Sequence, residues 1–139
     1  MTILDTNILS ELMRPEPSAK VIEWIRFQPA LSLYITTITQ AEILYGIAFL
    51  PAGERKTNLY KTAIDMFRED FNGRILPFDP VAAEKFAEIA SNRHQAGQPI
   101  SQFDAQIAAI ARSRGAGVAT RNDRNFLNCG IEVVNPWTS

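Results

Sequence analysis

Residues 1–12 read MTILDTNILSEL, and this stretch decides the fold of the chain. Residues 2–4 are β-branched or apolar and predict a short buried strand, and an apolar helical pattern begins soon after it. Asp5 lies between the two, followed by Thr6 and Asn7, whose side-chain oxygens are suited to capping the first turn of the helix. An acid fixed at the carboxyl end of a strand stands where open parallel sheets bind their ligands.

The length of 139 residues predicts one domain, residues 1–139, which buries about two-thirds of its unfolded surface. A hydrophobic content of 46% is that of an ordinary globular protein. The net charge of -1 gives no bulk attraction to nucleic acid or to a membrane, so a polyanionic ligand requires a basic patch or bound cations. Because Cys129 is the only cysteine and no apolar run reaches transmembrane length, we expect a cytoplasmic protein without membrane contact.

Strand patterns alternate with helical patterns along the chain. Strands are expected over residues 2–4, 33–36, 75–78, 118–120 and 131–134, and helices over 8–13, 18–28, 39–50, 54–71, 80–94 and 101–114. Pro77 indicates that the third strand lies at an edge, and the spacing of Thr39 and Glu42 is that of a capping box. This alternation predicts an α/β fold with a mostly parallel five-stranded sheet covered on both faces.

Four acids stand at junctions between these elements: Asp5, Glu42, Asp104 and Asp123. For any one of them, a favourable contact with a helix N-terminus explains the position equally well. As a group they are more telling, because a parallel sheet gathers its strand ends at one edge. Asp104 is the clearest case, since it lies in an alanine-rich helix built for burial, where an unpaired carboxylate is costly. Converging carboxylates stay ionised around a divalent cation, and all-oxygen ligands favour Mg²⁺ or Mn²⁺.

Other catalytic groups are scarce. His94 is the only histidine and lies in a polar stretch, and Cys129 lies in a turn with no motif to activate it. No phosphate-binding glycine motif occurs. Because a carboxylate-bound metal needs no side-chain nucleophile, the acids favour metal-assisted hydrolysis of a phosphate ester.

Several stretches resemble those of PIN-domain proteins, in particular the VapC/FitB-like toxins of prokaryotic toxin–antitoxin pairs. They are residues 3–12 (ILDTNILSEL), 39–46 (TQAEILYG), 104–111 (DAQIAAIA), 119–122 (ATRN) and 135–137 (NPW). The resemblance covers essentially the whole chain, in order. It implies an α/β/α sandwich and a Mg²⁺- or Mn²⁺-dependent endoribonuclease, usually dimeric. It also implies a small DNA-binding antitoxin whose tail fills the site, with operator DNA bound only by the complex.

The resemblance assigns roles residue by residue. Asp5, Glu42 and Asp104 match the acidic triad, with Asp5 and Asp104 as direct metal ligands and Glu42 as a direct or water-mediated one. Thr6, Asn7 and Ser101 match polar positions around the site.

The fourth acid departs from the pattern. Relatives often carry an acid at the position of Asn122 or Asn125, where this chain has amides, and Asp123 lies between them. Two alternatives remain: Asp123 serves as the fourth acid, with Asn122 as a polar neighbour, or the site uses three acids. In the first case, Asp123→Ala lowers cleavage less than Asp5→Asn does.

RNA binding by a nearly neutral chain requires local arginines, for which the candidates are Arg14, Arg93, Arg121 and Arg124. For each one alone, solvation or an internal ion pair is the simpler interpretation. The wide apolar face over residues 41–50 suggests a homodimer, although cover by the helix over residues 54–71 explains it as well.

Two other functions compete with the nuclease. One is a catalytically weak subunit that acts by binding its antitoxin and, as a complex, operator DNA. The other is a phosphatase with Asp5 as nucleophile. It is disfavoured because such enzymes usually need a second acid at the position of Asn7.

Overall fold

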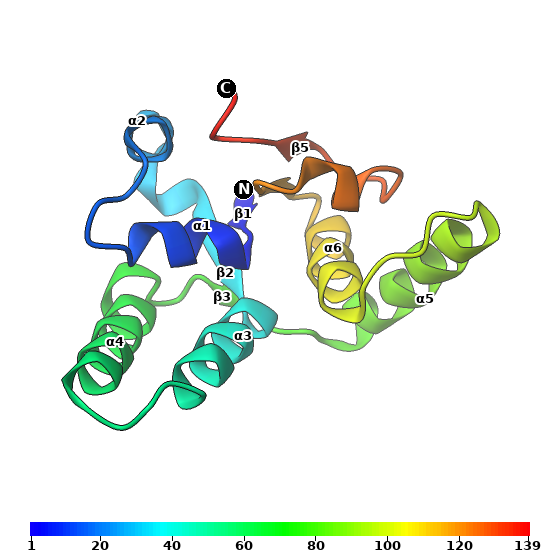
Figure 1. Ribbon diagram of the computed structural model, residues 1–139. Helices are drawn as coiled ribbons and strands as arrows, with labels where there is room; N and C mark the ends of the chain where they lie inside the picture. The colour runs from blue at the N-terminus through cyan, green and yellow to red at the C-terminus, as the bar shows by residue number, and fades with distance from the viewer.

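The computed structural model describes residues 1–139, and its centre is a sheet of five strands (Figure 1). The strands are β1 (Thr2–Leu4), β2 (Leu33–Thr36), β3 (Ile75–Leu76), β4 (Gly117–Ala119) and β5 (Val133–Val134). Their order is β3-β2-β1-β4-β5, and every neighbouring pair is parallel. The predicted parallel sheet is confirmed, and β3 lies at an edge, as Pro77 indicated. Both edge strands, β3 and β5, have two residues where four were predicted.

Helices cover both faces of the sheet (Figure 1). They are α1 (Thr6–Leu12), α2 (Ala19–Phe27), α3 (Thr37–Ala48), α4 (Glu54–Asp65), α5 (Pro80–Gln95) and α6 (Gln102–Arg114). Three short segments join them: the 3-10 helices η1 (Ala30–Ser32) and η3 (Asp123–Phe126), and the π-helical turn η2 (Met66–Asp70) that continues α4. The sequence predicts the helix over residues 54–71 as one element, and only its last turn differs.

Two cores explain why the sheet needs helices on both sides. Successive residues of a strand point to opposite faces, so Ile3 packs with α5, α6 and η3, whereas Leu4 packs with α1 to α4. Val118 and Ala119 of β4 divide between the two cores in the same way. The alanine-rich α6 lies in the first core, and Gly115 ends it in the left-handed conformation that glycine adopts readily.

The caps of two helices differ from the prediction. Asp5, rather than Thr6 or Asn7, is the N-cap of α1, and its carboxylate accepts a hydrogen bond from the Thr6 N–H. Thr36 caps α3 by accepting from the Thr39 N–H, so Thr39 is not the cap of a capping box. In both cases the cap residue has extended backbone and the helix begins at the next residue. The helices therefore begin directly at the sheet edge.

The carboxyl ends of β1, β2 and β4 meet at one edge of the sheet. α1 and α3 start there because they follow β1 and β2 directly. α6 also starts there, because it precedes β4 and runs back along the sheet before the strand begins. Its N-cap is Ser101, whose side chain accepts from the Asp104 N–H. No helix is long and apolar enough to span a membrane.

Candidate functional site

A cavity of about 590 Å³ lies at this edge of the sheet. Its lining is almost entirely polar: Asp5, Thr6, Asn7, Ser10, Glu11, Arg14, Glu42, Asp104, Arg121, Asn122 and Trp137. Three of the four acids singled out in the sequence are thus brought together, from the end of β1, from α3 and from α6. Ser101, Asp123, Arg93 and Arg124 are not part of the lining.

Asp5 is held in the wall of the cavity and is only 5% exposed. One carboxylate oxygen accepts from the Thr6 N–H at 2.7 Å, and the other from the Thr120 hydroxyl at 2.7 Å. The Asn7 amide donates to the same second oxygen at 3.3 Å and to Thr120 Oγ1 at 3.3 Å. Asp5 is therefore fixed in one orientation. Thr120, which the sequence places only at a strand end, is the residue that orients it.

The charge of Asp5 is poorly compensated. Burial raises the pKa of Asp5 from 3.8 to about 6, in spite of the hydrogen bonds from Thr120 and Thr6. The negative charges of Asp104 and Glu42 raise it further. The carboxylates therefore repel one another in this cavity, which is the situation that a bound cation relieves.

Glu42 is anchored by threonines. Its Oε1 accepts from the Thr6 hydroxyl at 2.8 Å, and Thr6 Oγ1 lies 2.9 Å from Thr39 Oγ1. Burial raises the pKa of Glu42, the Thr6 hydrogen bond opposes this, and Asp104 adds to it. Thr6 thus links two acids, because its N–H binds Asp5 and its hydroxyl binds Glu42.

Asp104 completes the group from the first turn of α6. Burial raises its pKa, and the side chains of Ser101 and Asn125 and the charge of Arg93 lower it. Asn125, at one of the positions where relatives often carry an acid, therefore belongs to the surroundings of Asp104. An amide there donates to the carboxylate without adding charge.

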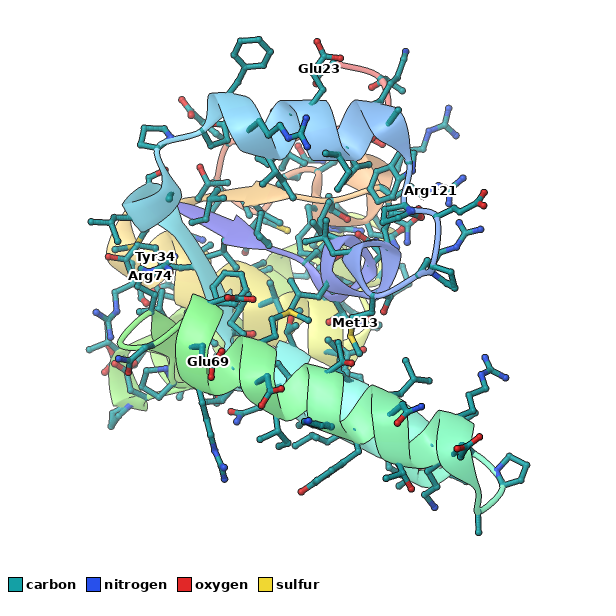
Figure 2. All side chains as sticks on the ribbon, turned by 90° about the vertical axis from the view of Figure 1, so that its left-hand side faces the viewer. Met13, Glu23, Tyr34, Glu69, Arg74 and Arg121 are labelled. Carbon is teal, nitrogen blue, oxygen red and sulfur yellow. The ribbon has the colours of Figure 1, made fainter.

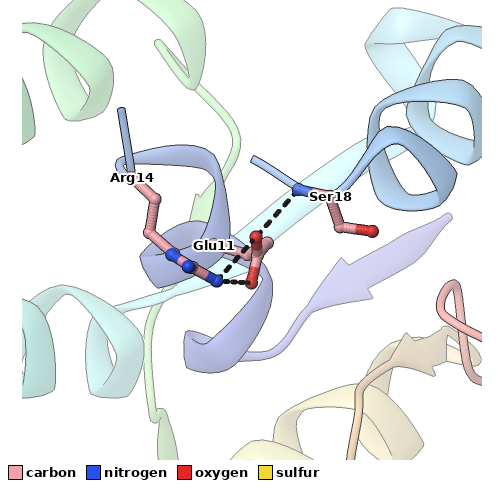
Figure 3. A network of polar contacts seen from close by, with 3 residues as sticks. All are labelled: Glu11, Arg14 and Ser18. Carbon is pink, nitrogen blue, oxygen red and sulfur yellow. Dashed lines mark hydrogen bonds and ion pairs between the residues drawn. The ribbon is translucent and has the colours of Figure 1, made fainter. Parts of the chain in front are cut away.

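Glu11 is a fourth acid of the cavity that the sequence pattern did not indicate. It is 5% exposed, accepts from the Ser18 N–H at 2.8 Å and pairs with Arg14 at 3.3 Å (Figure 3). The Ser18 N–H, followed by Arg14, lowers the pKa of Glu11. The acid is thus already compensated, and it ties α1 to the start of α2. No spacing in the sequence reveals this, because the contact depends on how the proline-rich turn folds.

The four arginines that were predicted to contact RNA lie in different surroundings. Arg14 and Arg121 line the cavity, whereas Arg124 is exposed on η3 away from it. Arg93 is only 6% exposed and donates to the backbone carbonyls of Gln98, Asn125 and Leu127. The prediction that Arg93 contacts RNA is wrong, because its guanidinium is used inside the protein to hold two loops together.

The fourth-acid position is occupied by an amide. Asn122 lines the cavity and donates its backbone N–H to Thr120 Oγ1 at 3.1 Å. Asp123 is exposed at the start of η3 and does not line the cavity. His94 is exposed, and the Cys129 thiol is buried with a pKa raised by desolvation, so neither supplies a nucleophile or base.

The donor set fits a hard divalent cation in chemistry and charge. Four carboxylates and two guanidinium groups line the cavity, and the Glu11–Arg14 pair neutralises one of each, which leaves three acids against Arg121. No three His, Cys, Asp or Glu side chains are close enough to hold one ion together. Mg²⁺ commonly takes one or two protein carboxylates and keeps water as its other ligands, so fewer direct ligands suffice.

In metal-free solution, we expect Asp5→Asn to gain stability relative to the native chain as the pH rises. Below pH 3.8 the native carboxyl is protonated in both the folded and the unfolded chain, and burial of its charge costs nothing. Between pH 3.8 and about 6 only the unfolded chain ionises it, so the native chain loses stability. The loss reaches about 3 kcal/mol above that range, at about 1.4 kcal/mol per pKa unit. Urea unfolding of both chains in EDTA at about pH 4 and pH 7 measures it, and an equal difference at both pH values contradicts the prediction.

Comparison with known proteins agrees with this geometry. Residues 2–131 match the family model of the PIN domain. The chain is 38% identical over 137 residues to the VapC ribonuclease Y4jK of Sinorhizobium fredii, covering 99% of this chain and 98% of that protein. It is 37% identical over 137 residues to Toxin FitB of Neisseria gonorrhoeae, covering 99% of both. Its structure matches that of FitAB bound to an IR36 DNA fragment with a TM-score of 0.92 and 37% identity, over 99% of this chain and 96% of that chain. The chain therefore belongs to the PIN-domain family, among the members that include VapC and FitB.

Proposed function

We propose that this protein is a divalent-metal-dependent endoribonuclease and the toxin of a toxin–antitoxin pair. The observation that carries the proposal is the group of three acids, Asp5, Glu42 and Asp104, that share one cavity and form no ion pair. The similarity to a VapC ribonuclease supports RNA as the substrate. Cleavage of RNA by the purified chain in Mn²⁺, compared with the same chain in EDTA, tests the proposal.

The proposed roles follow from the contacts. Asp5 and Asp104 hold Mg²⁺ or Mn²⁺, and Glu42 binds it directly or through water. The bound cation supplies electrostatic stabilisation of the charge that develops on the phosphodiester. Thr120 and Thr6 keep the carboxylate of Asp5 in one orientation, so no reorganisation is needed when the substrate arrives.

We propose a three-acid site, because Asn122 and not Asp123 faces the cavity. Asn122→Asp adds a carboxylate to the lining, and we expect it to tighten Mn²⁺ binding and to hold or raise cleavage. Asp123→Asn removes a carboxylate from the neighbouring exposed position, and we expect cleavage at limiting Mn²⁺ to stay within about twofold of native, as for surface changes in general. A larger loss in Asp123→Asn restores this residue as the fourth acid.

A partner protein has a place to bind. A second cavity of about 590 Å³ lies between α1, α3 and α4, and shares Thr6, Ser10, Arg14 and Glu42 with the first. Its lining includes Met13, which lies between α1 and α4 in Figure 2, and apolar residues of α3. An antitoxin tail along this cavity reaches the acids directly. The similarity to FitAB bound to DNA supports binding of operator DNA by the complex.

We also propose that the chain forms a homodimer through α3. α4 covers part of the wide apolar face of α3, because Ile43 and Ile47 are buried in the same core as Leu59 and Ala63. Tyr45 and Phe49 stay 65% and 73% exposed, with their rings edge to face at 4.8 Å. We expect light scattering to give a dimer mass at micromolar concentration and Phe49→Asp to lower it. A monomer mass that does not rise with concentration excludes this dimer.

The alternative function is a catalytically weak subunit that binds its antitoxin through the same surface but leaves RNA essentially uncleaved. The altered fourth-acid position, where Asn122 supplies no charge, is the observation in its favour. A catalytically weak subunit forms the same complex with its antitoxin but gives no Mn²⁺-dependent RNA products. The cleavage assay therefore separates the two functions.

A further inference from the structure

The C-terminal motif Asn135–Trp137 has no role in the proposed chemistry, yet it lies against the acidic cavity. Trp137 lines the cavity together with Arg121. The guanidinium carbon of Arg121 lies 5.1 Å from the centroid of the Trp137 ring, within the range of a cation–π interaction.

The backbone of Arg121 is held on both sides. Its N–H donates to Asn7 Oδ1 at 3.2 Å, and its carbonyl accepts from the Asn135 amide at 3.1 Å. Asn135 Oδ1 in turn accepts from the Trp137 N–H at 2.9 Å. One asparagine therefore ties the arginine to the aromatic ring that contacts it. Asn7 also donates to Asp5, so the hydrogen bonds that hold the backbone of Arg121 extend to the proposed metal ligand.

The guanidinium of Arg121 has no acceptor inside the protein. It forms no hydrogen bond or ion pair, whereas the other cavity arginine, Arg14, is paired with Glu11. In Figure 2, Arg121 lies on the side of the molecule where α1 is seen end-on. Arg121 is exposed, and its charge acts on Glu11 without forming an ion pair, so its N–H groups are free to donate to an anionic ligand at the edge of the cavity. Phosphate matches the donor geometry of a guanidinium.

We propose that Arg121 binds the RNA phosphate next to the one that is cleaved, and that Asn135 and Trp137 are positioning residues for it. This inference rests on the proposed function, since it takes RNA as the substrate. The contact places the strand relative to Asp5 without reading its sequence. The cation–π interaction and the two backbone hydrogen bonds hold the arginine before RNA arrives, which reduces the entropy lost on binding.

The test measures binding separately from cleavage. The probe is a fluorescein-labelled oligouridylate of about 10 nucleotides, bound to chains that carry Asp5→Asn, and its anisotropy is followed in metal-free KCl solutions. We expect Arg121→Ala to weaken binding about fivefold to tenfold and to reduce the slope of log K against log salt by about 0.7. The matched control, Arg124→Ala, removes an exposed arginine outside the cavity, and we expect less than a twofold change and the same slope.

The roles of Trp137 and Asn135 are tested through Arg121. We expect Trp137→Ala and Asn135→Ala to weaken binding, Trp137→Phe to retain it, and neither alanine to weaken it further once Arg121→Ala is present. A purely structural role lowers binding equally in both backgrounds. Trp24→Phe leaves Trp137 as the only tryptophan, so we also expect its fluorescence to change on addition of the probe and not in Arg121→Ala.

Three results overturn the inference: no binding of the probe, equal effects of Arg121→Ala and Arg124→Ala, or additive effects of Trp137→Ala and Arg121→Ala. If the native chain fails to cleave RNA but the Arg121 effects are seen, the nuclease proposal fails and the phosphate site stands. If the chain cleaves RNA and Arg121→Ala binds the probe with the same affinity as the chain that keeps Arg121, only the phosphate site is rejected.

Discussion

Asp5→Asn is expected to lower RNA cleavage by at least about 100-fold. Loss of a group that merely orients a metal ligand costs about 10–100-fold, and Asp5 is proposed to be a ligand itself. The substitution keeps the shape of the side chain, and one oxygen still accepts from the Thr6 N–H. Gel analysis of RNA products in Mn²⁺ measures the change.

The loss has to be distinguished from unfolding. Because Asp5 carries a destabilising charge in the metal-free chain, the variant is expected to be folded and at least as stable as the native chain in EDTA at neutral pH. Asp123→Asn is the matched control, since it removes the same charge from an exposed position. A variant that stays folded and cleaves RNA at more than a tenth of the native rate excludes Asp5 as a ligand.

Arg93→Ala is expected to cause the largest loss of stability, about 3 kcal/mol or more in the free energy of unfolding. The side chain is buried and donates to three backbone carbonyls, at 2.6 Å to Gln98, 2.9 Å to Asn125 and 2.8 Å to Leu127. Removing it leaves these acceptors without a donor, at about 1–3 kcal/mol for each that water does not reach. Urea unfolding measures the loss.

Arg124→Ala provides the comparison for this change. Arg124 is exposed and belongs to the same segment that Arg93 holds, so its loss is expected to change stability by no more than about 0.5 kcal/mol. Similar losses in the two variants mean that Arg93 does not organise the loops.

The sequence was sufficient for the sheet and for the main acids. Asp5 follows a strand directly, Glu42 lies in the second turn of α3 and Asp104 in the first turn of α6. Each position is therefore set by local spacing plus the rule that parallel strands end at one edge. The alanine-rich helix was identifiable for the same reason, because its composition shows burial on nearly all sides. These features depend on periodicity and on nothing distant in the chain.

The features that the sequence did not predict correctly depend on contacts between distant segments of the chain. Arg93 looks like a surface arginine in a polar stretch, and it is buried only because the loops at Gln98 and at residues 125–129 fold over it. Spacing did not determine whether Asn122 or Asp123 faces the cavity, because a short 3-10 helix begins between them. Thr120 and Trp137 gain their roles from partners over a hundred residues away or across a turn.

The predicted cap residues of α1 and α3 were wrong for a local reason. Thr6, Asn7 and Thr39 are good capping residues, but Asp5 and Thr36 stand earlier at the strand ends and cap the helices first. The displaced threonines are then free to bind the acids, as Thr6 does with Glu42. Because α1 and α3 begin early, Thr6 and Thr39 can form the polar contacts beside Glu42.

Binding of Mn²⁺ followed by the loss of the EPR signal of the free ion tests the central claim most directly. It requires neither the correct RNA nor the antitoxin. The native chain is expected to bind one or two ions, and Asp5→Asn and Asp104→Asn are expected to lose this binding while Asp123→Asn retains it. Equal Mn²⁺ binding by the native chain and by both cavity variants contradicts the proposed site.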